Sequence, residues 1–341
     1  MTLHALAPAR AAGIALGVLA DAMVGDPRHG HPVAVFGRWA GTLERLGYAP
    51  SRSRGAGYLT AAVSGPVLLG LVVERATARH QVARVLTTAL ATWVALGGSS
   101  LVGEGLAMAR ALERDDLPAA RQRLTHLCAR DPADLSASDL ARATVESMAE
   151  NTSDAMVAPL FWAALAGVPG VLGYRAVNTL DAMVGYRSPR YLKFGWASAR
   201  LDDLVNLAPA RLTGLLTVVL APSVGGSSAG AWRIWRRDAG RHPSPNAGHC
   251  EASAAGALGL ELGGTNSYAG QTENRPLIGA PGRLPDITDV RRAARLSRYV
   301  GLGAAVLAIA VPAVTGSVRR RSTGQKITRQ KSGLRRTGGG R

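Results

Sequence analysis

The stretch that decides the fold is residues 145–186, which read VESMAENTSDAMVAPLFWAALAGVPGVLGYRAVNTLDAMVGY. Its centre, Met156–Tyr174, is an apolar run of membrane-spanning length, but Gly167, Pro169 and Gly170 break it. Glycine and proline interrupt helices, so the run is expected to be re-entrant or interfacial if it does not span. Acids and amides flank it on both sides, where a purely structural membrane hairpin would gain little from them.

Three carboxylates precede this run at helical spacing. Glu146, Glu150 and Asp154 recur at i, i+4 and i+8, so on a helix they share one face. Amides, acids and basic residues follow the run: Asn178, Asp181, Asp202, Asp203, Asn206, Arg175, Arg187, Arg190, Lys193, Arg200 and Arg211. Carboxylates that hold a hard cation beside arginines that hold phosphate are what phosphoryl chemistry needs. The alternative is that each charge forms a solvated face or an interfacial anchor.

The composition of the whole chain indicates a membrane protein. It has 341 residues, of which 47% are hydrophobic, and a net charge of +17. The apolar residues are gathered in blocks: Ala11–Val24, Ala56–Val73, Val82–Val102, Met156–Tyr174, Leu212–Val224 and Tyr299–Thr315. This pattern predicts a mainly α, polytopic integral membrane protein with about 4–6 membrane segments and helical extramembrane regions. Cys128 and Cys250 indicate neither a disulfide nor a zinc site, and the sequence contains no Walker or Rossmann glycine motif.

The blocks divide the chain into six expected regions. They are N-terminal membrane helices at 1–103 with the loop GDPRHGHPV, a helical extramembrane subdomain at 104–155, a central motif region at 156–225 with membrane or re-entrant segments, an extramembrane loop region at 226–298, a C-terminal membrane helix at 299–316 and a disordered basic tail at 317–341. Ser136 or Ser138 is expected to cap the helix that carries Glu146. The tail has no acid and no aromatic residue, so its expected partner is anionic lipid and not nucleic acid.

Two loops stiffened by proline and glycine carry further candidate site residues. The first, GDPRHGHPV at 25–33, presents His29 and His31 for binding of substrate or metal. The second, SPNAG at 244–248, precedes an apolar helix that is expected to start near Glu251, whose free N-terminal amides form a ready anion site. An ordinary turn and a plain helix cap are the alternatives.

With these residues in view, the chain resembles the adenosylcobinamide-phosphate synthase family, the cobalamin-biosynthesis membrane proteins usually called CobD or CbiB. The resemblance is carried by GDPRHGHPVAVFGR, VESMAENTSDAMVAPLFWAALAGVPG, YRAVNTLDAMVGYRSPRYLKFGWASARLDDLVNLAPARL and HPSPNAGHCEASAAGALGLELGG with SYAG after it, and it covers residues 10–315. Gly30 stands where proline is expected before HPV, and the basic tail has no family counterpart.

The resemblance implies that ATP and Mg²⁺ are used to join (R)-1-aminopropan-2-yl phosphate, or its ethanolamine analogue, to the free propionate of adenosylcobyric acid. Making an amide from a carboxylate needs an activated acyl group, and an acyl-phosphate route needs Mg²⁺ held by carboxylates, basic groups on the phosphates and a base that frees the amine. Carried onto the motifs, this assigns Mg²⁺ to Glu150, Asp154, Asp181, Asp202 and Asp203, phosphate or corrinoid contacts to Arg175, Arg187, Arg200, Asn178, Ser244, Asn246 and Gly248, and catalysis to His31, Glu146 and Lys193. The implied partners are the corrinoid, the amino-alcohol phosphate, membrane lipid and other late cobalamin-pathway membrane enzymes. The implied location is the cell membrane, with the active site on the cytoplasmic side.

Two other classes of protein share the membrane pattern. A non-enzymatic sensor or regulator on the same scaffold has no need of NTLD, ARLDD and SPNAG together. A corrinoid transporter is compatible with the broken segment, but the hydropathy pattern shows no inverted repeat. If all motif loops face one side, the segments 156–174 and 212–224 must each return to the side they left. The last span then places the basic tail across the membrane from the motifs.

Overall fold

A computed structural model describes residues 6–27, 30–268 and 271–336 of the chain. The helices are α1 (Leu6–Val24), α2 (Pro32–Gly47), α3 (Arg52–Ala76), α4 (Gln81–Ala95), α5 (Gly98–Glu113), α6 (Leu117–Leu124), α7 (Ala137–Thr152), α8 (Ala158–Val184), α9 (Tyr191–Phe194), α10 (Trp196–Val205), α11 (Leu207–Leu220), α12 (Ser228–Asp238), α13 (Ala247–Leu258) and α14 (Ile287–Arg336). A π-helical turn, Ser153–Val157, joins α7 to α8. Two strands, β1 (Leu262–Tyr268) and β2 (Gln271–Ile278), pair antiparallel.

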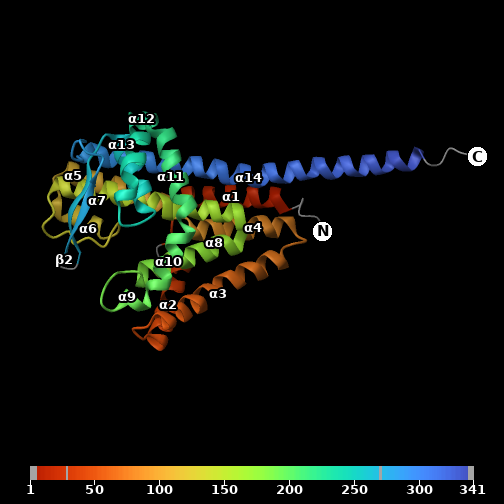
Figure 1. Cartoon of the computed structure of the whole chain (residues 1–341), viewed down its shortest axis with the longest axis horizontal. Coiled ribbons are helices and arrows are strands. Elements are labelled where there is room, and N and C mark those ends of the chain that lie inside the picture. The colour runs from red at the N-terminus through yellow and green to blue at the C-terminus, as the bar shows by residue number, and fades with distance from the viewer. Residues whose placement is uncertain (1–5, 28–29, 269–270, 337–341) are drawn as a thin grey trace, which may run out of the picture.

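The predicted mainly α, polytopic membrane architecture is confirmed. Five helical stretches in the described part of the chain are long and apolar enough to cross a membrane: Arg52–Ala76, Gln81–Glu113, Ala137–Val184, Leu207–Val224 and Ile287–Pro312. In Figure 1, α1, α3, α4, α8 and the middle of α14 form one bundle, and α5, α6, α7, α13 and the β-hairpin gather at one end of it. The gathered elements are called the end domain below.

Helix α8 is a hairpin and not a straight rod. Gly167 has φ 66° and ψ −148°, a backbone conformation that L side chains rarely adopt. It divides α8 into a first arm, 158–166, and a second arm, 168–184. Asn178 and Asp154 are in contact although 24 residues separate them, a separation that would span about 36 Å in a straight helix. The predicted break in the apolar run is thus confirmed, and the chain returns to the end that it left.

The hairpin turn is stabilised by a partly buried polar contact. The carboxylate of Glu74 accepts hydrogen bonds from the Val168 amide, at 3.2 Å, and from Arg10, at 3.3 Å. Arg10 in turn donates to the carbonyl of Ala164 at 3.3 Å. Irregular backbone at membrane depth must have its polar groups satisfied by protein. These two charged residues supply the partners that the broken helix lacks.

The regions on either side of α8 partly match the predictions. Helix α7 begins at Ala137 with a capping box between Ser136 and Asp139, as predicted from the serines. Helix α13 begins at Ala247, four residues before the predicted start. The β-hairpin that follows was not predicted. Its strand β1 opens with Gly263 at φ 90°, and a β-bulge between Leu262 and Gly264 shifts the register there.

The C-terminal segment differs from the prediction of a short span and a disordered tail. Helix α14 starts at Ile287 and continues to Arg336, while residues 337–341 lie outside the described part. After Pro312 the sequence contains no proline that would end the helix, and helix extension is cooperative once a helix has formed. Figure 1 shows that α14 extends away from the α5–α7 end of the molecule.

Candidate functional site

A cavity of about 370 Å³ lies where the α8 hairpin returns to the end domain. It is lined by the end of α7, the π-helical turn, the end of α8 and the loop after it, α10, the 242–247 turn and α13. All five carboxylates predicted to bind metal line it, namely Glu150, Asp154, Asp181, Asp202 and Asp203. Arg187, Ser244 and Asn246 from the predicted set line it too. The cavity thus joins residues of three separate sequence motifs.

Two amide side chains and a tyrosine hold the aspartates in place. The Asn178 Nδ2 atom lies 3.4 Å from both Asp154 Oδ2 and Asp202 Oδ1. The Asn206 Nδ2 atom donates to Asp202 Oδ2 at 3.0 Å, and its own Oδ1 accepts from the Tyr174 hydroxyl at 3.1 Å. Because Asn178 and Asn206 are neutral donors, their hydrogen bonds do not neutralise the charges of Asp154 and Asp202, which can still bind a cation.

The cavity carries an excess of negative charge. Its five carboxylates face two arginines, Arg187 and Arg275. Burial, followed by the charge of Asp181, raises the pKa of Asp202 from 3.8 to about 7. Burial also raises the pKa of Asp203, against the influence of Arg200. A bound cation would stabilise the ionised form of these carboxylates.

The arrangement is better suited to an Mg²⁺ ion that also binds substrate phosphate than to an ion held by protein ligands alone. Among the described residues, no three His, Cys, Asp or Glu side chains lie close enough together to hold one ion. Mg²⁺ keeps several waters and is commonly held by one or two carboxylates together with substrate phosphates. Asp154 and Asp202, linked through Asn178, are a suitable carboxylate pair for this mode of binding.

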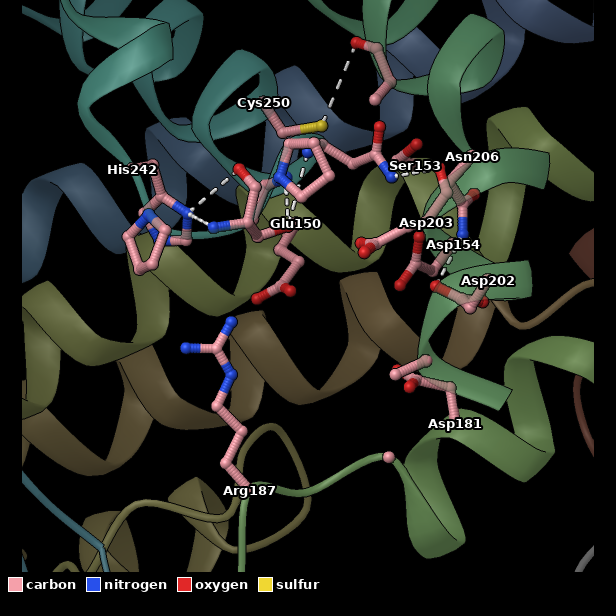
Figure 2. Close-up of a pocket in the computed structure, with 18 of the residues that line it drawn as sticks. Glu150, Ser153, Asp154, Asp181, Arg187, Asp202, Asp203, Asn206, His242 and Cys250 are labelled. Atoms are coloured by element: carbon pink, nitrogen blue, oxygen red, sulfur yellow. Dashed lines mark hydrogen bonds between the residues drawn. The ribbon is translucent and has the colours of Figure 1, made fainter. Parts of the chain in front are cut away.

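Figure 2 shows the opposite walls of the cavity. The four aspartates Asp154, Asp181, Asp202 and Asp203 lie on one side, and Glu150 extends into the middle with Arg187 approaching it. Glu150 is exposed to the cavity. In the part of the chain that the structure describes, no amide side chain bridges Glu150 to the aspartates, so it differs from Asp154 and Asp202 in its hydrogen bonding.

In the 242–248 turn, a side chain of the turn itself already binds some of the backbone amides that were predicted to bind an anion. Ser244 Oγ accepts hydrogen bonds from the amides of Asn246, at 3.3 Å, and Ala247, at 3.2 Å, so part of the predicted anion site is capped internally. Asn246 donates through Nδ2 to the Asp203 carbonyl at 2.8 Å. Gly248 does not line the cavity; a Cβ there would lie 2.2 Å from the Ala239 carbonyl oxygen. Its role is close packing of α13.

Glu146 does not line the cavity; it is part of a buried structural ion pair. It is buried, pairs with Arg130 at 2.6 Å and accepts a hydrogen bond from the Gly263 amide at 2.7 Å. It thereby ties the β-hairpin to α7. Helical spacing did predict its face, but the β-hairpin that covers that face was not visible in the sequence.

Four more predicted residues lie outside the cavity lining. His31 caps α2, with its Nδ1 accepting from the Val33 amide and its Nε2 3.8 Å from Asp26. Lys193 is exposed on α9, and Arg200 is exposed beside Asp203 at 3.7 Å. Arg175 lines a second, apolar groove and donates a hydrogen bond to Asn178, at 3.4 Å, beside the acidic cluster. His29 lies outside the described residues.

Other residues in the lining were not singled out from the sequence. They are His242, Cys250 and Arg275, whereas Asn206 was named from the sequence in the polar cluster but given no role. His242 and Cys250 belong to the HPSPNAGHC motif, which was a usable signal. Arg275 comes from β2, and nothing in its local sequence marks it. His242 Nε2 lies 3.7 Å from Glu251 Oε1, and Arg275 lies 4.0 Å from the same atom.

Comparison with known proteins gives one consistent family. The family described as "CobD/Cbib protein" matches residues 14–297. A Mycobacterium tuberculosis protein named "Cobalamin biosynthesis protein CobD" is 55% identical over 300 residues, which are 88% of this chain and 95% of that protein. Proteins of the same name from Geobacter metallireducens (48% over 284 residues, 82% and 89% of the two chains) and Rhodobacter capsulatus (40% over 313 residues, 89% and 97%) are also similar. No solved structure matches the chain.

Proposed function

The chain belongs to the CobD/CbiB family, and from this membership we propose that it acts in cobalamin biosynthesis as adenosylcobinamide-phosphate synthase. The proposed reaction condenses adenosylcobyric acid with (R)-1-aminopropan-2-yl phosphate, or ethanolamine phosphate, using ATP. One amide bond forms between the propionate carbonyl carbon and the amine. ATP yields ADP and phosphate, and the propionate loses one oxygen.

The observation that carries this proposal is the mixed charge of the cavity. Five carboxylates and the two arginines Arg187 and Arg275 line a single space of about 370 Å³. A reaction that brings together a triphosphate, a second phosphate and a carboxylate needs both a cation site and fixed positive charge. Neither an apolar membrane sensor nor a simple anion site needs the two together.

Each wall of the cavity receives a role in the proposed mechanism. Asp154 and Asp202 would hold Mg²⁺, with Asp181 and Asp203 beside them. When bound, Mg²⁺ neutralises phosphate charge and orients the transferred group. Arg187 and Arg275 would bind the phosphate oxygens, for which the guanidinium fork is well suited. Glu150, which extends into the cavity, would accept the proton that the attacking amine loses.

We also propose that the end of the molecule that carries the cavity faces the cytoplasm. ATP, which the proposed reaction consumes, is supplied there. Cysteine-free protein (Cys128→Ala and Cys250→Ser) carrying Ala133→Cys, in the connection between α6 and α7, should react with a membrane-impermeant maleimide only in inside-out vesicles. Arg79→Cys, in the connection between α3 and α4, should react only in right-side-out vesicles. The reverse pattern contradicts this orientation.

Product formation is the direct test of function. Purified protein in detergent, with ATP, Mg²⁺, adenosylcobyric acid and the amino-alcohol phosphate, should yield adenosylcobinamide phosphate and stoichiometric ADP. Omitting any one component should abolish the product. Absence of product beside an active relative as positive control refutes the enzyme assignment. Uptake of labelled corrinoid into empty vesicles without product would instead favour a transporter.

A further inference from the structure

A second hollow in the molecule is an apolar groove of about 400 Å³ between α2, α3 and the second arm of α8. Its walls include Val35, Phe36, Trp39, Leu69, Leu172 and Ala176. Arg175 is the charged residue among those that line it. The groove therefore combines a long apolar wall with a single positive charge, a different chemistry from that of the acidic cavity.

The groove lies on the surface that faces lipid. Helix α3 is a candidate span whose apolar residues point outward: Leu68 and Leu69 are each 58% exposed and Val72 is 63% exposed. On α2, Trp39 is 41% exposed and packs against Phe36, with ring centroids 5.8 Å apart and the ring planes tilted by 52°. Exposed leucine and valine on a spanning helix contact acyl chains, and tryptophan favours the boundary of the bilayer. The groove thus opens sideways into the membrane.

Arg175 is placed to bind an anion at one wall of this groove. Its Nη1 atom donates to Asn178 Oδ1 at a long 3.4 Å, and its buried Nε atom has no hydrogen-bond partner among the described residues. A buried, unsatisfied donor on a charged group is costly. A phosphate oxygen would satisfy it with a charge-assisted hydrogen bond.

We propose that this groove binds one anionic phospholipid of the surrounding bilayer, with an acyl chain between Trp39 and Leu172 and the phosphodiester at Arg175. An amino-alcohol phosphate has too little apolar surface to fill such a groove, whereas a phospholipid matches both the apolar wall and the charge. The existence of this lipid site does not require that the reaction proposed above is correct. Because Arg175 contacts Asn178, which bridges Asp154 and Asp202, a bound lipid would also help to fix the acidic cavity.

Quenching of tryptophan fluorescence by a brominated lipid tests the proposal, because bromine quenches only at near contact. The full chain in neutral detergent is titrated with phosphatidylglycerol that carries bromine on one acyl chain. Saturable quenching is expected, and Trp39→Phe should remove most of it. Brominated phosphatidylcholine should bind about fivefold more weakly, since one arginine near the membrane surface contributes about that factor. Arg175→Gln should abolish this preference and Arg175→Lys should retain it.

Two glycines on α3 provide a matched pair of blocking and control variants. The nearest atom to a Cβ built at Gly65 is Trp39 Cη2, at 3.4 Å, so Gly65→Leu projects into the groove. A Cβ at Gly57 meets nothing within 4 Å, so Gly57→Leu adds the same bulk on the same helix elsewhere. Gly65→Leu should prevent saturable quenching, and Gly57→Leu should not.

Three outcomes would overturn the proposal. Equal quenching by both lipids in the wild type would show ordinary boundary lipid only. Unchanged quenching in Gly65→Leu would place the lipid elsewhere. Displacement of the brominated lipid by ethanolamine phosphate at constant ionic strength would show that Arg175 serves the substrate phosphate instead.

Discussion

Asp202→Asn should produce a protein that is more stable and much less active, because the same carboxylate charge strains the folded protein and binds the cation. With a pKa of about 7 in place of 3.8, ionised Asp202 costs the folded protein roughly 4 kcal/mol at pH 8 relative to the unfolded chain. Asparagine removes that cost. Asparagine has one side-chain oxygen where aspartate has two, so its NH₂ group faces the donor of either Asn178 or Asn206. One hydrogen bond, worth about 1–1.5 kcal/mol, is thereby lost. The net stabilisation without Mg²⁺ is therefore about 2–3 kcal/mol at pH 8.

The sign of this effect depends on pH. Asp202 has a higher pKa in the folded protein than in the unfolded chain. Its carboxyl group therefore does not reduce the stability of the fold below the unfolded-state pKa of 3.8, and it reduces that stability as the pH rises from there through about 7. The wild type should thus lose stability between about pH 4 and pH 7, and Asp202→Asn should lose less. Near pH 4 the two proteins should melt at similar temperatures.

The effect on turnover has the opposite direction. Loss of the charge that offsets Mg²⁺ should lower turnover by roughly a hundredfold or more, a barrier increase of about 2.7 kcal/mol. The assays are thermal melts in detergent from pH 4 to pH 8, and the rate of product formation as Mg²⁺ is varied. Asp134→Asn, an exposed acid outside the cavity, is the matched control and should change neither quantity. Near-normal turnover in Asp202→Asn, with no gain in melting temperature at pH 8, would refute both the metal role and the electrostatic reasoning.

Three further variants test the surrounding structure. Glu146→Gln breaks the buried pair with Arg130 and should destabilise by about 3–5 kcal/mol, while turnover per folded molecule stays within about threefold; a dead protein of normal stability would restore Glu146 as the base. Asp238 is buried, and its hydrogen bond from Arg237 holds its pKa below the ordinary value, so its contribution to stability is present above pH 3.8 and is lost at lower pH. At pH 7 the free energy of unfolding of Asp238→Asn should therefore be about 1–3 kcal/mol below that of the wild type, and near pH 3 the two proteins should be similar in stability. A stability difference that does not change with pH would contradict this reasoning. Gly167→Ala should destabilise the α8 hairpin, because its φ is 66° and the new Cβ would lie 2.0 Å from Glu74 Oε1, whereas Gly240→Ala, with nothing within 4 Å, should be neutral in the same melts.

Sequence alone determined those features that depend on neighbouring residues. Apolar blocks of sufficient length predicted the spans, because the thickness of a bilayer sets the number of residues needed. Ser136 predicted the start of α7 since its side chain caps the first amides, and Gly167 with Pro169 predicted the break in α8 since neither continues a regular helix. The acids of the cavity were also predicted as a group from their motifs.

Tertiary structure decided which of these residues meet, because packing between distant segments leaves no local periodic signal. Glu146 and Glu150 lie one helical turn apart, yet the β-hairpin buries the first in an ion pair and the second faces the cavity. Asp154 meets Asn178 only because the hairpin folds the chain back on itself. Arg175, three residues before Asn178, contacts Asn178 and also lines the apolar groove. Helical spacing assigns a residue to a face of its own helix, and only the neighbouring elements determine whether that face becomes core, cavity or lipid contact.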